Sequence, residues 1–200
     1  MQLSGVLKRI AVKLSKTCND LRLLSSGPRA GLGEIVLPAV QAGSSIMPGK
    51  VNPVIPEVVN QIAFEVIGND ITVTMAAEAG QLQLNAFEPI IAHSLFESLA
   101  HLAAGCRTLA ERCVKGIAAN RERARRFLDE STALVTALNP ILGYARSSEI
   151  AQEALRTGTK VYDLVLAKGL MTREQLDQVL KPEILTQPHY STVHKPRSDA

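Results

Sequence analysis

Residues 57–79 read EVVNQIAFEVIGNDITVTMAAEA, a stretch that would be apolar on nearly every side if it formed a helix. Its apolar side chains do not keep to one stripe; they are Val58, Val59, Ile62, Ala63, Val66, Ile67, Ile71, Val73 and Met75. A helix of this kind is buried by neighbours on several sides. Because a chain of 200 residues offers too few neighbours of its own, the stretch predicts a central helix in an obligate oligomer.

Two further long helices are expected, one on each side of this stretch. Residues 1–24 carry an apolar stripe at steps of three and four residues, which stops at the helix breakers of residues 25–28. Pro89 fits the first turn of another helix, whose near-heptad stripe ends at Gly116. Long helices joined by turns form a bundle. The two stripes are Leu3, Leu7, Ile10, Leu14, Cys18, Leu21 and Leu24, and Ile91, Leu95, Leu99, Leu102, Cys106, Leu109 and Cys113.

The connections and the C-terminal part have a different character. Residues 27–56 hold five glycines and five prolines, which predicts a long loop of the kind that is usually functional. Beyond residue 118 the helices shorten, to about 118–129, 146–157, 160–168 and 172–180, the last capped by Thr172. We therefore predict an all-α chain. A long-helix bundle segment (1–138, including a loop at about 33–53) is followed by a small helical C-terminal domain (139–188) and a flexible tail (189–200).

Composition and charge narrow the classes of function. Hydrophobic residues make up 46% of the chain and aromatic residues 4%, which indicates a globular protein with an aliphatic core. A net charge of +3 argues against a nucleic-acid partner. The basic group at Arg121, Arg123, Arg125 and Arg126 is expected to be a solvated helix face with i,i+4 ion pairs rather than a site for an anionic partner. No apolar run is long enough to cross a membrane, and a cytoplasmic location is expected.

The cysteines and histidines suggest no metal and no cofactor. Cys18, Cys106 and Cys113 are dispersed and contain no CxxC, which argues against a disulfide framework and a zinc site. Cys106 and Cys113 lie seven residues apart, so they are expected to share one helical face as small core residues. His93 and His101, two turns apart, are expected to be structural or interfacial.

A candidate binding loop occupies residues 43–53, GSSIMPGKVNP. Gly43 permits unusual backbone angles, and Ser44 and Ser45 offer hydroxyl and amide donors. Lys50 and Asn52 follow just before the next helix. Donors of this kind suit a carboxylate. On these residues alone, however, a Gly/Ser linker with a solvent-exposed lysine is the favoured interpretation.

The full string GSSxMPxKxNP resembles the serine loop of the fumarase/aspartase superfamily, which also includes argininosuccinate and adenylosuccinate lyases. Further stretches similar to this superfamily flank the loop, namely NDLR at 19–22, SGPR at 26–29 and GND at 68–70. The resemblance extends to about Pro188. VIPEVVNQ at 54–61 and AAEAGQLQLN at 76–85 are similar to the aspartases, whereas Gly49 is a fumarase-like feature. The chain thus resembles the C-terminal part of an aspartate ammonia-lyase subunit.

This resemblance implies an all-helical homotetramer with active sites shared between subunits, which eliminates ammonia from L-aspartate to give fumarate. The elimination is anti and passes through an aci-carboxylate. By position, Ser44 is expected to remove the Cβ proton, Lys50 and Asn52 to bind substrate carboxylate, and Ser45 to help hold the other carboxylate. Glu57 matches an acidic residue that pairs with an active-site histidine from another region.

Only the last of the family's three active-site regions is present, so the isolated chain is expected to be inert. Two alternatives remain open at this point. The first is a fumarate hydratase, which turns over malate rather than aspartate. The second is a non-catalytic remnant that acts only as a helical oligomerisation module, for which no other polypeptide would carry the missing regions.

Overall fold

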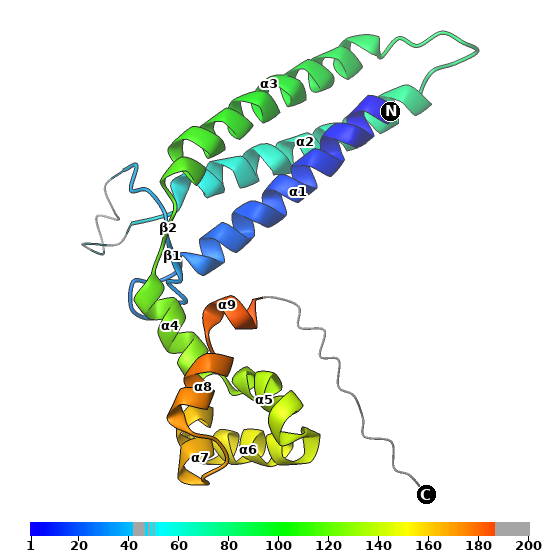
Figure 1. Ribbon diagram of the computed structural model, residues 1–200. Coiled ribbons are helices and arrows are strands. Elements are labelled where there is room, and N and C mark those ends of the chain that lie inside the picture. Colours follow the sequence, from blue (N-terminus) through cyan, green and yellow to red (C-terminus); the bar gives the residue numbers. More distant parts are fainter. Residues whose placement is uncertain (42–46, 48, 50, 187–200) are drawn as a thin grey trace, which may run out of the picture. The chain divides into compact units, whose positions relative to one another are not determined.

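The computed structural model describes residues 1–41, 47, 49 and 51–186 (Figure 1). The chain divides into two compact units, Met1–Arg121 and Glu122–Ala200. Over the described residues the regular structure is helical apart from two strands of two residues each, which confirms the all-α prediction. The division lies ahead of the sequence boundary near Asn139, because Leu134 and Leu138 are buried in the core of the second unit.

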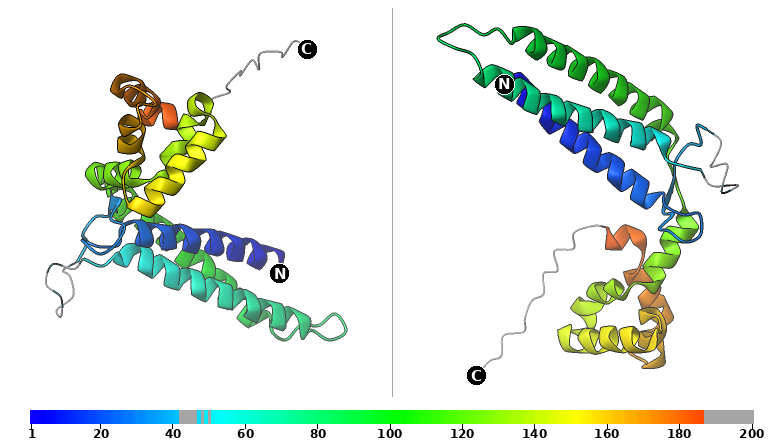
Figure 2. Two further views of the ribbon diagram at one scale, coloured as in Figure 1. Left: turned by 90° about the horizontal axis from the view of Figure 1, so that it is seen from below. Right: turned by 180° about the vertical axis from the view of Figure 1, so that it is seen from behind.

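Three long antiparallel helices build the first unit, as predicted (Figures 1 and 2). They are α1 (Gln2–Leu24), α2 (Val54–Glu78) and α3 (Glu88–Arg112). Helix α2 packs more extensively against α1 and α3 than these two pack against each other, and the buried residues of all three helices share core clusters. The apolar stretch 57–79 is therefore the middle helix of the three.

Helix α2 begins three residues earlier than the sequence indicated. Pro53 is its N-cap, and Pro56 lies in the first turn. Backbone N–H groups in the first turn have no partner within the helix, so a proline there costs no hydrogen bond. The prolines that were read as loop residues are compatible with the start of a helix.

The buried row of α3 agrees only in part with the predicted stripe, because Leu102 and Leu109 are buried as expected whereas Leu99 is exposed. The buried residues are Ser94, Ser98, Leu102, Gly105 and Leu109. A Cβ at Gly105 would lie 3.0 Å from Cδ1 of Ile62, so the small residues let α3 approach α2 closely. The prediction that Cys106 is a core residue is wrong, since it is exposed, whereas Cys113 is buried. Small residues define the contact face because a short distance between helices excludes larger side chains.

Polar contacts fix the register of the three helices. Ser4 Oγ and Lys8 Nζ on α1 donate to the Asp70 carboxylate on α2 over 2.5 and 3.0 Å. Asn69, the residue before Asp70, donates from Nδ2 to Ser98 Oγ on α3 over 3.1 Å. These hydrogen bonds lower the pKa of Asp70, that from Ser4 most, because they stabilise the carboxylate. The GND string at 68–70 thus ties α2 to both neighbours.

A short pair of strands closes the end of the bundle where α1 ends and α2 begins. Strand β1 (Ile35–Val36) pairs antiparallel with β2 (Ala118–Ala119), with Ile35 opposite Ala119. The 3₁₀ turn η1 (Val114–Gly116) leads from α3 into β2. Glu34 N donates to Leu24 O over 2.9 Å, and Asn120 N donates to Glu34 O over 2.8 Å. The segment after α1 is therefore held against the segment that leaves α3.

The second unit consists of short helices around one core. They are α4 (Arg121–Glu130), η2 (Thr132–Leu134), α5 (Val135–Leu142), α6 (Tyr144–Thr157), α7 (Val161–Ala167), α8 (Arg173–Val179) and α9 (Pro182–Leu185). Helix α4 has no buried residue, and its Arg125–Asp129 ion pair of 2.8 Å confirms the predicted i,i+4 pairing. Thr172 caps α8 in a capping box with Gln175.

The sequence-based prediction did not include helix α5, because it placed a domain boundary at residues 138–140. Pro140 lies inside this helix, and Gly143 ends it. Leu138 is fully buried in the core of the unit. Burial of an aliphatic side chain of this size offsets the backbone hydrogen bond that the proline removes.

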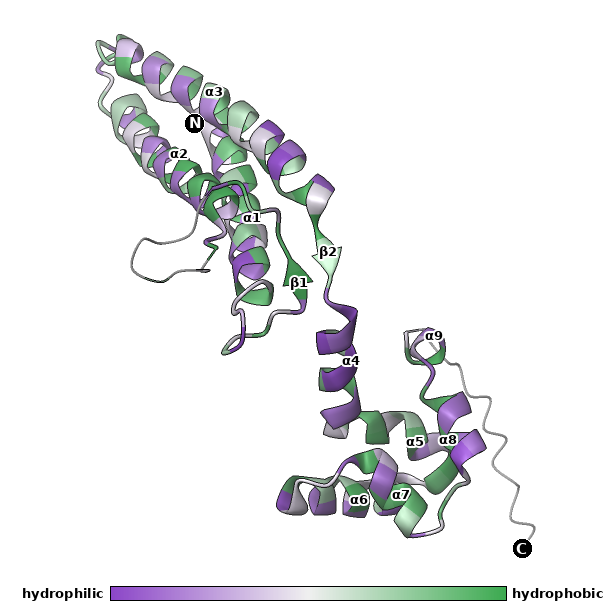
Figure 3. Cartoon of the chain, turned by 90° about the vertical axis from the view of Figure 1, so that its left-hand side faces the viewer, coloured by the Kyte–Doolittle hydropathy of each residue, from purple (hydrophilic) through white to green (hydrophobic). Residues whose placement is uncertain are grey.

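Many large apolar side chains of the first unit are exposed. They include Leu3 and Ile10 of α1, Phe64 and Ile71 of α2, and Phe96 of α3. Figure 3 shows hydrophobic residues interspersed with hydrophilic ones along all three helices, in contrast to the mostly hydrophilic α4. Within the described part of the chain, no helix combines the length and the apolarity that a membrane crossing requires.

Candidate functional site

A cavity of about 270 Å³ lies beside the predicted binding loop, where the chain leaves α1 and enters α2. Its walls come from the end of α1, the following turn, β1, the residues before α2, and the residue after β2. The lining residues are Ser25, Ser26, Gly27, Pro28, Gly33, Ile35, Val36, Leu37, Pro38, Gly49, Val51, Asn52, Pro53 and Asn120. The cavity thus combines segments that lie far apart in the sequence.

Local hydrogen bonds shape one wall of this cavity. Ser26 Oγ donates to Leu23 O over 2.6 Å and accepts from Leu32 N over 3.1 Å. A Cβ at Gly31 would lie 2.4 Å from the carbonyl of Ser26, so the turn closes only around a glycine. The SGPR stretch at 26–29, which resembles the lyase superfamily, therefore forms part of the cavity wall.

The described residues include two of the five predicted site residues. Asn52 is half-buried and lines the cavity, and its carbonyl accepts from Val54 N over 2.9 Å. Glu57 lies in the first turn of α2, where the helix dipole favours a carboxylate. Ser44, Ser45 and Lys50 lie outside the described residues. The roles of all five residues stay predictions.

Asn120 is a cavity residue that sequence analysis missed. It follows β2 and reaches the cavity only because Ala119 pairs with Ile35, far away in the sequence. A two-residue strand of alanines carries no periodic signal, so no local pattern could have indicated this pairing.

The cysteines are all free, and two of them are unsuited to nucleophilic chemistry. Burial, then the neighbouring Cys113, raises the pKa of the Cys18 thiol to about 11. Burial also raises the pKa of Cys113. Since the thiolate is the nucleophile, both side chains are inert core residues at neutral pH.

A second cavity of about 510 Å³ lies within the second unit. Its lining mixes three cations (Arg125, Lys160 and Lys181) with three carboxylates (Asp129, Asp163 and Asp177) and is completed by Leu128, Leu134, Tyr162, Leu180 and Pro182. Tyr162 Oη donates to Asp177 Oδ1 over 2.8 Å, which raises the pKa of the phenol because the bond stabilises its protonated form. No residue of the predicted binding loop lines this cavity, so it is not the candidate site.

Comparison with known proteins places the sequence among lyases. The family model described as "Lyase" matches residues 1–68, and the model described as "Fumarase C C-terminus" matches residues 134–187. The aspartate ammonia-lyase of Helicobacter pylori is 60% identical over 195 residues, which cover 98% of this chain and 42% of that protein. Curated aspartate ammonia-lyases of other bacteria are 55–59% identical. The chain spans about 40% of the length of these relatives.

Solved structures share the fold. The structure titled fumarate lyase:delta crystallin from Brucella melitensis bound to cobalt superposes with a TM-score of 0.88 at 60% identity, over 92% of this chain and 40% of that one. The class II fumarase of Schistosoma mansoni superposes with a TM-score of 0.84 at 40% identity, over 94% of this chain and 39% of that one. By sequence and by fold, the chain belongs to the fumarase/aspartase superfamily and matches the C-terminal part of its aspartate ammonia-lyases.

Proposed function

We propose that this chain is the C-terminal part of an aspartate ammonia-lyase, which converts L-aspartate reversibly to fumarate and ammonia. The observation that carries the proposal is a difference in similarity. Relatives named aspartate ammonia-lyase are 55–60% identical to the chain, whereas the Schistosoma fumarase is 40% identical over a similar length. This difference favours aspartate over malate as the substrate.

The loop residues then have distinct roles in an anti elimination. Removal of the Cβ proton by Ser44 drives charge into the adjacent carboxylate and gives an aci-carboxylate dianion. Lys50 and Asn52 bind that carboxylate and stabilise it more strongly as its charge grows, which lowers the barrier. Ser45 helps to hold the other carboxylate. Glu57 orients a histidine from another region of the enzyme and does not touch the substrate.

A serine is a weak base at neutral pH, so Ser44 requires particular surroundings. Nearby amides and the Lys50 ammonium stabilise the alkoxide, provided that water is excluded. The half-buried position of Asn52 in a cavity walled by α1, β1 and Asn120 supports such an enclosed site.

The active enzyme is a homotetramer whose active sites are shared between subunits, and it works in the cytoplasm. Exposed apolar side chains on all three long helices, such as Ile10, Phe64 and Phe96, support this assembly. Solvent-exposed apolar surface of this extent marks a protein interface. Packing the central helices of four copies together would cover it.

The proposal is tested by assaying aspartate deamination with the chain combined with a polypeptide that carries the other active-site regions of a related aspartate ammonia-lyase. Fumarate formation is followed by ultraviolet absorbance. We expect Ser44→Ala to lower kcat by about a thousandfold or more, with little change in KM. Asn52→Ala is expected to raise KM for aspartate.

Gln41→Ala, in the same loop but outside the matched motif, serves as the control and should leave turnover unchanged. Normal turnover by Ser44→Ala would refute the serine assignment. Faster turnover of malate than of aspartate would establish the fumarate hydratase alternative. No turnover of either substrate by the combined polypeptides would favour the oligomerisation remnant.

A further inference from the structure

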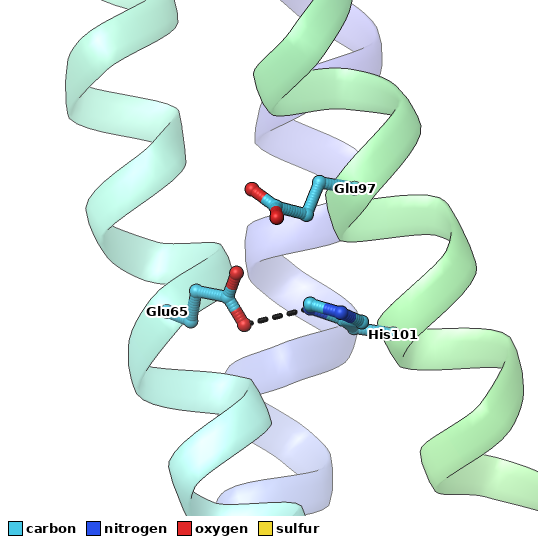
Figure 4. A group of neighbouring side chains, drawn as sticks. All are labelled: Glu65, Glu97 and His101. Carbon is cyan, nitrogen blue, oxygen red and sulfur yellow. Dashed lines mark hydrogen bonds and ion pairs between the residues drawn. The ribbon is translucent and has the colours of Figure 1, made fainter.

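Three potential metal ligands meet between α2 and α3, away from the cavity beside residues 43–53. One ligand atom each from Glu65, Glu97 and His101 lies within 4.8 Å of the other two. His101 Nδ1 is 2.8 Å from Glu65 Oε2 (Figure 4). Glu65 comes from α2, Glu97 and His101 come from α3, and α1 passes behind them in Figure 4. The group therefore lies on the face of the α2–α3 pair that is turned away from α1.

The helix segments that carry these side chains are held against each other by contacts on both sides of the group. Toward one end, Asn69 of α2 donates to Ser98 of α3 over 3.1 Å. Toward the other end, Gly105 of α3 lies against Ile62 of α2. Glu65 lies between Ile62 and Asn69 in the sequence, so the register that brings it to α3 is fixed by packing rather than by the cluster itself. Ligands on two packed helices are positioned more precisely than ligands on loops.

The spacing on α3 places His93 in the same row as Glu97 and His101. Glu97 and His101 are one helical turn apart, and His93 precedes Glu97 by one turn, so all three share a helical face. His93 Nε2 is 3.3 Å from Glu97 Oε2. Glu97 is thus flanked by two imidazoles, and His93 is placed to orient its carboxylate, as outer partners orient metal ligands.

The charges and the distances both suit a cation. Two carboxylates face one imidazole, which can bind a metal in its neutral form. Ligands at about 2.1 Å from a tetrahedral ion are separated from each other by about 3.4 Å. The separations between the ligand atoms, from 2.8 Å to at most 4.8 Å, lie on either side of that value, and all three side chains are partly exposed and can adjust by rotation.

We propose that Glu65, Glu97 and His101 bind one divalent first-row transition-metal ion, of the Zn²⁺ or Co²⁺ type, and so link α2 to α3. Imidazole nitrogen with carboxylate oxygen suits these ions, whereas Mg²⁺ and Ca²⁺ prefer sites of oxygen alone. Water completes the coordination on the exposed side. The site lies apart from the proposed serine loop and does not depend on the ammonia-lyase reaction.

Calorimetric titration of the 200-residue chain with Zn²⁺, and with Co²⁺ followed by visible absorption, tests the site. All proteins carry His189→Gln and His194→Gln, so that the tail cannot bind the metal. We expect one ion per chain and an affinity that falls about tenfold or more in both His101→Gln and Glu65→Gln. Glu111→Gln, an exposed charge change on the same helix, is the matched control and should bind as the parent does.

Two further measurements separate metal binding from loss of structure. Helical content by circular dichroism must be the same in all variants, because both substitutions are at partly exposed positions. Added Zn²⁺ should raise the melting temperature of the parent but not that of His101→Gln, since a ligand stabilises only the state that binds it. The proposal is overturned by equal affinity of parent and His101→Gln, or by an absence of binding, which would leave a plain His101–Glu65 ion pair.

Discussion

The two units of the chain bury their apolar residues in different ways. In the second unit, ten buried residues from η2 to the end of α8 form one core cluster, which includes Leu138, Val165 and Leu176. In the first unit, the buried residues fall into two smaller clusters, one around Val66 and one around Val59. Of the large apolar side chains that are exposed in the described residues, all but Ile141, Tyr144 and Leu155 lie in the first unit.

The difference has a geometrical cause. Short helices that turn back on one another surround a common centre, so that each can bury an apolar face within the same chain. Three long helices side by side bury only the faces that they turn toward one another. The middle helix α2 has two neighbours, yet Phe64, Ile71 and Met75 remain exposed. The second unit closes around one core of its own, whereas many large apolar side chains of the first unit remain exposed.

The largest effect is expected at the exposed apolar surface of the first unit. Phe96→Asp would place an unpaired carboxylate in the proposed subunit interface, at a cost of several kcal/mol that symmetry repeats in every subunit. Light scattering after size exclusion should then show a smaller assembly. Leu155→Asp is the matched control, because Leu155 is 72% exposed in the second unit and Phe96 is 71% exposed in the first. An assembly unaffected by Phe96→Asp would mean that this face of α3 is not an interface.

A cavity made in the core of the second unit should lower the free energy of unfolding. Leu176 is 0% exposed, and Leu176→Ala should lower the free energy of unfolding by about 2–5 kcal/mol. Urea denaturation followed by circular dichroism measures the change. Leu155→Ala, at an exposed position, should change stability by less than about 0.5 kcal/mol. Equal effects of the two substitutions would contradict a single closed core.

A smaller effect is expected from the polar contacts between α1 and α2. The pKa of Asp70 is lower in the folded than in the unfolded chain, so its contribution is present above the unfolded pKa of about 3.9 and is lost as pH falls through the folded pKa. Asp70→Asn should therefore lower the free energy of unfolding by about 1–2 kcal/mol at pH 7. The difference should vanish in strong acid.

Denaturation of both proteins across pH 2–7 checks this prediction. Asp20→Asn removes the exposed ion pair with Lys16 and serves as the control. Surface pairs contribute less than about 1 kcal/mol, so its effect should be smaller. A difference between Asp70→Asn and the parent that stays constant down to pH 2 would show that the carboxylate charge is not the cause.

The smallest effect is expected at the start of α8. Thr172→Ala removes the hydroxyl that accepts from Gln175 N over 3.3 Å and breaks the capping box. The free energy of unfolding should fall by about 1 kcal/mol. Thr172→Ser, which keeps the hydroxyl, should recover most of it in the same urea titration. If Thr172→Ser lowers the free energy of unfolding as much as Thr172→Ala does, packing of the threonine methyl group is responsible and not the cap.

Much of the fold follows from local pattern. The breakers at residues 25–28 end α1 where expected, and Thr172 caps α8 as predicted. The site was less accessible to this reasoning. The motif of residues 43–53 indicated the binding loop, but the wall formed by Asn120 depends on the pairing of β1 with β2. Two residues per strand are too few to leave a recognisable periodicity.

The sequence by itself determined that the three long helices form, though not α5, because helix formation depends on residues three and four positions apart. Only the tertiary structure decided which side of each helix is buried. On α3 that side takes in Ser98 and Gly105 and leaves Cys106 exposed, since the facing helix selects small side chains. The same long-range packing brought Glu65 of α2 to His101 of α3, because contacts between helices depend on register and distance that no local spacing specifies.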